Sequence, residues 1–200
     1  MEIVFEKFCC PPDGYEEKHY RDESIGPYGI IGTRGPRSKG DIFYNHMPAA
    51  ELRGKLGPEI FDSYFKFCVV RNPYDKVVSY FWHMLNDKES KRLGDAPFDL
   101  VRTKFREFLR AKNQMPLDRD VFTINGDVIV DEFIRYESLE PGVQSICDKL
   151  GVAYAMGSLG RYKSGIRVRN EPFADYYDAT AKAVVGNQFR FEIDAFGYSF

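Results

Sequence analysis

The sequence lacks several features that would each assign the protein to a broad class. It contains no run of about 18 apolar residues, so it predicts no membrane-spanning helix. It also lacks an excess of basic residues, because 28 lysines and arginines are set against 30 aspartates and glutamates. This balance excludes a nucleic-acid binder that relies on a high overall positive charge. Any anion-binding site must therefore be a local concentration of arginine and lysine.

Cysteine is scarce as well. The four cysteines, at positions 9, 10, 68 and 147, do not have the spacing of a metal site, and an adjacent pair is a poor start for a disulfide framework. The N-terminus has no basic segment followed by an apolar stretch, so it does not resemble a secretory signal. We expect reduced thiols and a cytoplasmic location.

The residues that are present favour a folded chain. A hydrophobic fraction of 44% in 200 residues predicts a single domain, residues 1–200, with a substantial core. Apolar spacing predicts helices over 1–8, 48–55, 97–112, 141–150 and 174–189, and short strands over 65–70 and 133–136. Residues 11–41 are rich in glycine, proline and charge and are expected to be loop, and residues 121–130 are expected to form a β-hairpin around Asn125 and Gly126.

The clearest unit is a strand, a short turn and a helix at residues 65–85. Pro73 suits the first turn of a helix and Asn72 can cap it, which predicts the half-unit from which α/β sheets are built. Arg71 then lies at the carboxyl end of the strand, where helix N-termini bind phosphate or sulfate. Position alone leaves open an alternative, in which Arg71 is simply paired with a nearby carboxylate.

The segment Phe67–Phe81 closely resembles the 3′-phosphate-binding segment of the sulfotransferases, which use 3′-phosphoadenosine-5′-phosphosulfate as sulfuryl donor. The resemblance implies a P-loop-NTPase-like parallel sheet flanked by helices, with Arg71 and Ser79 on the donor's 3′-phosphate. The alternative for Ser79 is a small residue at a helix contact. Four further segments, 45–51, 133–139, 176–178 and 196–198, are similar to the carbohydrate-type and bacterial branch of these enzymes.

The same resemblance suggests the remaining site residues. His46 is the candidate general base, because a histidine near neutral pKa suits removal of a proton from an attacking hydroxyl. It could instead be a surface or core histidine. Residues 161–169 hold four cations and no acid. Sulfotransferases fold a late basic loop over the 3′-phosphate, which implies Lys163, Ser164, Gly165 and Arg167 as contacts. A solvated basic loop is the alternative, and the resemblance implies no metal.

One expected part of the family pattern is missing. Sulfotransferases hold the 5′-phosphosulfate in a loop between the first strand and the first helix, and residues 1–8 resemble the helix that follows that loop. Either the strand and loop lie upstream of Met1, or the chain lacks them. Without the first strand, an exposed sheet edge predicts poor solubility or a homodimer.

These observations predict a sulfotransferase that moves a sulfuryl group to a hydroxyl of a carbohydrate or small molecule, with residues 11–41 and 87–97 as acceptor walls. The alternative is a non-catalytic nucleotide-binding or assembly protein with the same fold. A P-loop kinase-like enzyme is disfavoured, because the sequence has no Walker-type glycine-rich loop ending in Gly-Lys-Ser/Thr and no Walker-type aspartate.

Overall fold

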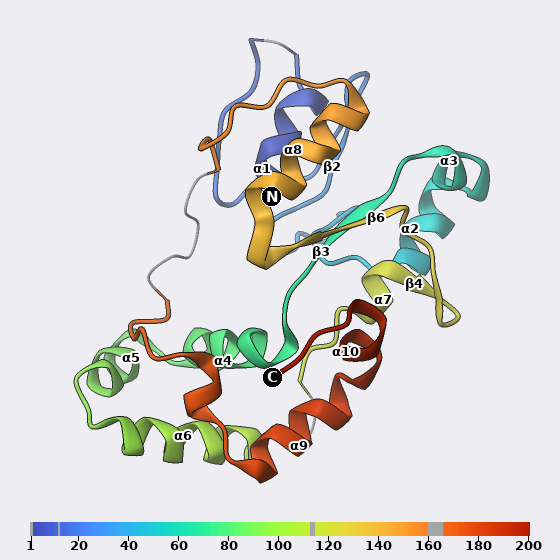
Figure 1. Cartoon of the computed structure of the whole chain (residues 1–200). Helices are drawn as coiled ribbons and strands as arrows, with labels where there is room; N and C mark the ends of the chain where they lie inside the picture. Colours follow the sequence, from blue (N-terminus) through green and yellow to red (C-terminus); the bar gives the residue numbers. More distant parts are fainter. Residues whose placement is uncertain (1, 12, 113–114, 160–165) are drawn as a thin grey trace. The chain divides into compact units, whose positions relative to one another are not determined.

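The computed structural model describes residues 2–11, 13–112, 115–159 and 166–200 (Figure 1). It is a mixed α/β protein in which helices predominate. The chain divides into two compact units. Unit 1 comprises Met1–Cys68, Asp118–Ile134 and Ser138–Leu159, and unit 2 comprises Val69–Leu117, Arg135–Glu137 and Gly160–Phe200. Among the described residues, no helix combines the length and the apolar character needed to cross a membrane.

Unit 1 begins with the predicted N-terminal helix, which is α1 (Glu2–Glu6) followed by the 3₁₀ turn η1 (Lys7–Cys9). The predicted helix at 48–55 is α2 (Ala49–Leu56), and α8 (Leu139–Leu150) matches the helix predicted over 141–150. A further helix, α3 (Pro58–Ser63), was not predicted. It can start so soon after α2 because Gly57, with φ 83°, turns the chain and Pro58 opens the new helix.

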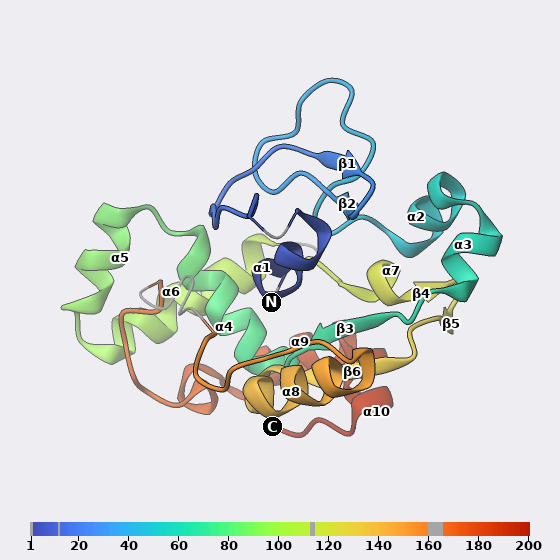
Figure 2. The same ribbon diagram turned by 90° about the horizontal axis from the view of Figure 1, so that it is seen from above.

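The segment 11–41 was expected to be loop, and that expectation is wrong for its middle part. Strands β1 (Ser24–Gly26) and β2 (Gly29–Ile31) form an antiparallel hairpin in which Ile25 is opposite Ile30 (Figure 2). Glycine makes up one residue of each three-residue strand, and Ile25 and Ile30 are 54% and 38% exposed. The sequence therefore carried no alternation long enough to indicate these strands.

The second hairpin of unit 1 was predicted, although both of its strands are shorter than expected. Strands β4 (Thr123–Ile124) and β5 (Asp127–Val128) are joined by Asn125 and Gly126, with φ 53° and 89°. These are the positive values that a type I′ turn requires. The two residues before β4 belong instead to α7 (Arg119–Phe122), because Phe122 is buried there and packs edge-on against Phe133.

Unit 2 is a helical cluster around α4 (Pro73–Met84), with α5 (Asp87–Gly94), α6 (Phe98–Ala111), the 3₁₀ turn η3 (Phe173–Tyr176), α9 (Ala179–Gln188) and α10 (Arg190–Phe196). Its core contains the residues expected from α4 and α6, including Val77, Val78, Phe81 and Phe105. The helix predicted over 174–189 is confirmed from Ala179 onward as α9, but its first residues belong to η3. The chain breaks at Tyr177, and Asp178 starts a new helix by accepting a hydrogen bond from the backbone N–H of Ala181.

The two remaining strands are β3 (Phe67–Val70) and β6 (Glu132–Arg135), which pair as a small parallel sheet (Figure 1). In the sequence, each begins in unit 1 and ends in unit 2, and β6 continues into the 3₁₀ turn η2 (Tyr136–Ser138). All sheets formed by the described residues have two strands. The α/β class is thus confirmed, and the wider P-loop-like sheet stays a prediction. Cys9, Cys10 and Cys147 are free thiols.

Candidate anion-binding site

The link between β3 and α4 has the predicted geometry. Pro73 lies in the first turn of α4, and the side-chain oxygen of Asn72 accepts a hydrogen bond of 3.0 Å from the backbone N–H of Tyr74. The backbone N–H of Asn72 donates to Glu137, and its side-chain amide donates to the carbonyl of Ser199. These bonds fix the turn and place Arg71 directly beside the N-terminus of a 12-residue helix.

Arg71 is paired with a carboxylate. Its Nε and Nη2 donate to Oδ2 of Asp75, one helical turn later, at 2.8 and 2.6 Å. The guanidinium also lies 4.3 Å from the centre of the Tyr136 ring, and 22% of the side chain is exposed. The simple ion pair that the sequence left open is therefore present.

A second arginine reaches the same carboxylate. Nη1 of Arg167 donates to Oδ1 of Asp75 at 3.0 Å, across 92 residues of sequence. Nη2 of Arg167 donates to the carbonyl of Glu171, and its guanidinium lies 5.3 Å from the ring centre of Tyr176. We call Arg71, Asp75 and Arg167 the Arg–Asp–Arg cluster. Two guanidiniums and one carboxylate leave it with a net positive charge.

The cluster has unused hydrogen-bonding capacity. Asp75 engages Nε and Nη2 of Arg71, and Nη1 of that side chain donates to no described residue. Nε of Arg167 is buried and has no hydrogen-bond partner among the described residues. A buried donor without a partner is costly, so it marks a place where a further acceptor would be stabilised.

Of the other predicted site residues, one lies near the Arg–Asp–Arg cluster on α4. Ser79 lies one turn beyond Asp75 on the same face of α4, because residues four apart on a helix are neighbours. Lys163, Ser164 and Gly165 fall outside the described residues. His46 belongs to unit 1, in the turn before α2, and its φ of 60° is in the left-handed region that few non-glycine residues occupy.

Arg169 belongs to the same basic stretch as Arg167 but has a structural role. Its Nη1 donates to the carbonyls of Gly94 and Ala96 at 2.9 and 2.7 Å, and its guanidinium pairs with Glu171. It thereby binds the carbonyls at the C-terminal end of α5. The hydrogen bonds that Arg169 donates to Glu171 raise the pKa of Arg169 and lower the pKa of Glu171.

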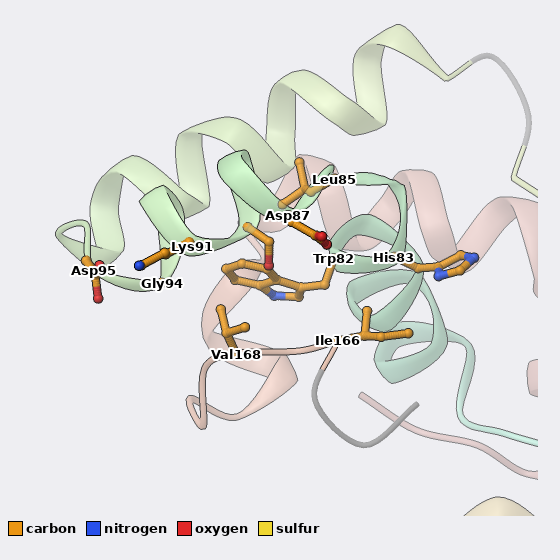
Figure 3. Close-up of a pocket in the computed structure, with 10 residues that line it drawn as sticks. Trp82, His83, Leu85, Asp87, Lys91, Gly94, Asp95, Ile166 and Val168 are labelled. Carbon is orange, nitrogen blue, oxygen red and sulfur yellow. The ribbon is translucent and has the colours of Figure 1, made fainter. Parts of the chain in front are cut away.

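A groove of about 570 Å³ lies in the same unit (Figure 3). The segment 87–97, which was predicted as an acceptor wall, contributes much of its lining, and residues on either side of Arg167 contribute the opposite side. What the groove accepts stays a prediction. Its lining residues are Trp82, His83, Leu85, Asp87, Ser90, Lys91, Gly94, Asp95, Ile166 and Val168.

Asp75 was not predicted as the residue that joins the two arginines. Its spacing from Arg71 was the available signal, since residues four apart on a helix can form an ion pair. The contact with Arg167 depends on the tertiary fold of unit 2, and no local pattern encodes it.

Comparison with known proteins adds one relative. No family matches the chain, and no solved structure matches it. An uncharacterized protein of Archaeoglobus fulgidus is 35% identical over 112 residues, which cover 53% of this chain and 83% of that protein. The chain belongs to the same family as this archaeal protein, whose name states no activity.

Proposed function

We propose that unit 2 binds the 3′-phosphate of 3′-phosphoadenosine-5′-phosphosulfate through Arg71, Ser79 and Arg167, and that the protein is a sulfotransferase. One observation carries the proposal. The family resemblance named Arg71 and Arg167 separately as phosphate contacts, and the two side chains meet at Asp75 in the first turn of α4.

The chemistry of the cluster suits a terminal phosphate. Arginine forms paired, charge-assisted hydrogen bonds to phosphate oxygens, and two arginines held together offer several such donors. The N-terminus of α4 adds a favourable dipole for an anion. Ser79, on the same helix face, is the proposed hydroxyl contact to the phosphate.

The proposed reaction is in-line transfer to a hydroxyl of a carbohydrate or small molecule. The acceptor oxygen forms a bond to sulfur while the bond from sulfur to the donor's 5′-phosphate oxygen breaks, which releases adenosine 3′,5′-bisphosphate. His46 is the proposed base that takes the hydroxyl proton. The resemblance supports this role, as does the unusual backbone conformation of His46, since such conformations cluster at active sites. The proposed fold is the P-loop-NTPase-like sheet of these enzymes.

Calorimetric titration of the full chain with adenosine 3′,5′-bisphosphate tests the binding step. We expect Arg71→Ala and Arg167→Ala each to weaken affinity by about tenfold or more, since hydrogen bonds to charged groups contribute about 1.5–3 kcal/mol. Arg102→Ala is the matched control, because it removes the same charge from a partly exposed helix position in unit 2. Unchanged affinity in both cluster variants, or no binding to the natural sequence, would refute the proposal.

Turnover separates the enzyme from a binding protein. The alternative is a nucleotide-binding protein without activity, since the Arg–Asp–Arg cluster by itself accounts for binding of an anion and for no transfer step. With the sulfuryl donor and a panel of hydroxyl acceptors, we expect His46→Ala to abolish transfer while calorimetry shows unchanged donor binding. Donor binding without transfer in the natural sequence would support the alternative.

We also propose a cytoplasmic location and a homodimer. The free thiols of Cys9, Cys10 and Cys147 suit a reducing compartment. The outer edges of the two-stranded β3–β6 sheet are a surface that a second copy could cover. Light scattering of the 200-residue chain should show a dimer or larger species. A monodisperse monomer at high concentration would contradict the dimer.

A further inference from the structure

We propose that Asp75 is an internal competitor for the phosphate position, so that the unoccupied anion site is closed by its own carboxylate. This inference rests on the proposed function for the identity of the nucleotide. It concerns a residue that neither the family resemblance nor the archaeal relative assigns to the site.

The carboxylate occupies the position that a ligand anion would take. Oδ2 accepts from two donors of Arg71, and Oδ1 accepts from Arg167. A phosphate monoester offers three terminal oxygens and a charge near −2, against two oxygens and a charge of −1 for the carboxylate. The ligand can therefore replace the contacts of Asp75 and add new ones, including one at the buried Nε of Arg167.

The structure argues against the simplest alternative, that Asp75 only holds the two arginines in place. Each guanidinium has other partners that fix its position. Arg71 lies over the Tyr136 ring, and Arg167 lies over the Tyr176 ring and donates to the carbonyl of Glu171. Removal of the carboxylate should therefore leave the donors near their present positions. The substitution removes a negative charge that lies within a few ångströms of the bound phosphate. In the natural sequence, this charge repels the phosphate and so lowers its affinity.

The test is the affinity of Asp75→Asn for adenosine 3′,5′-bisphosphate. Asparagine keeps the shape of the side chain and one oxygen acceptor but removes the charge. We expect binding about tenfold tighter than in the natural sequence, since like charges this close repel by more than 1 kcal/mol at the effective dielectric of a protein surface. Asp99→Asn is the matched control, because it removes one negative charge from an exposed first-turn position of α6. This control should leave affinity unchanged.

Binding of inorganic phosphate provides a second test that does not depend on the identity of the nucleotide. The chain has one tryptophan, Trp82, whose indole N–H donates to the hydroxyl of Tyr176 at 3.2 Å. Because the Tyr176 ring also lies against Arg167, an anion that engages Arg167 should change Trp82 fluorescence. Phosphate should produce this change at lower concentration in Asp75→Asn than in the natural sequence. Asp75→Ser should behave like Asp75→Asn, and circular dichroism checks that both variants fold.

The outcomes separate the two proposals. Suppose that neither the natural sequence nor Asp75→Asn binds the bisphosphate, but Asp75→Asn binds inorganic phosphate more tightly than the natural sequence does. The nucleotide assignment is then wrong, and the competitor role of Asp75 stands. Equal or weaker phosphate binding by folded Asp75→Asn and Asp75→Ser would overturn the competitor role, whatever the nucleotide does. An absence of phosphate binding in every variant would also overturn it.

Discussion

The buried hydrogen bond between Trp82 and Tyr176 allows us to predict how much stability the protein loses in the variant Tyr176→Phe. Both side chains are at most 1% exposed, and the indole N–H donates to the Tyr176 hydroxyl at 3.2 Å. Tyr176→Phe keeps the ring, and with it the packing against Phe98 and Phe105, but leaves the indole donor buried without this acceptor. An orphaned buried donor costs about 1–3 kcal/mol. Loss of the buried hydroxyl itself offsets part of this cost, so we expect destabilisation of about 1–2 kcal/mol.

Urea unfolding, followed by far-ultraviolet circular dichroism and by Trp82 emission, measures the effect. In a chain of this length, each kcal/mol of lost stability should lower the melting temperature by about 2–4 °C. Tyr64→Phe is the control, because the Tyr64 side chain is 62% exposed and its hydroxyl should contribute little. A Tyr176→Phe free energy of unfolding equal to that of Tyr64→Phe would refute the reasoning.

Three further predictions follow from other parts of the structure. Phe105→Ala should destabilise unit 2 by about 3–5 kcal/mol in urea unfolding, because Phe105 is fully buried and its ring centre lies 5.0 Å from that of Tyr177. A loss below 1 kcal/mol would contradict the packing of this core. Gly32→Ala should destabilise unit 1 by about 1–3 kcal/mol, because its Cβ would lie 2.8 Å from the backbone nitrogen of Tyr44; a melting temperature equal to that of the natural sequence would argue against this close approach. Burial raises the pKa of the Cys68 thiol from 9.0 to about 12, so its contribution to stability is present below pH 9 and is lost as the pH rises toward 12. Cys68→Ala should lack this part of the alkaline stability loss, and identical pH profiles for the two proteins would contradict it.

Local patterns predicted those parts of the fold that local interactions determine. Apolar spacing and the Asn72 cap fixed α4, and the Asn125–Gly126 pair fixed the β4–β5 turn. The β1–β2 hairpin was missed because its strands have three residues each and expose Ile25 and Ile30. No periodicity can develop over so short a length.

In the candidate site, too, local features could be predicted from the sequence and long-range contacts could not. The position of Arg71 after a strand and before a capped helix followed from the sequence, but its partner did not. An arginine followed four residues later by an aspartate is equally compatible with an ion pair and with an open anion site. Only the fold of unit 2 shows that Arg167 reaches the same carboxylate from 92 residues away. Long-range contacts of this kind depend on tertiary packing and leave no trace in local composition.

The central claim is that Arg71 and Arg167 together form one phosphate-binding site. A crystal structure of the full chain soaked with adenosine 3′,5′-bisphosphate examines this claim most directly. The account predicts a 3′-phosphate with oxygens within hydrogen-bond distance of both guanidiniums and with Asp75 displaced from at least one of them. A bound nucleotide located elsewhere, with the Arg–Asp–Arg cluster unchanged, would contradict it.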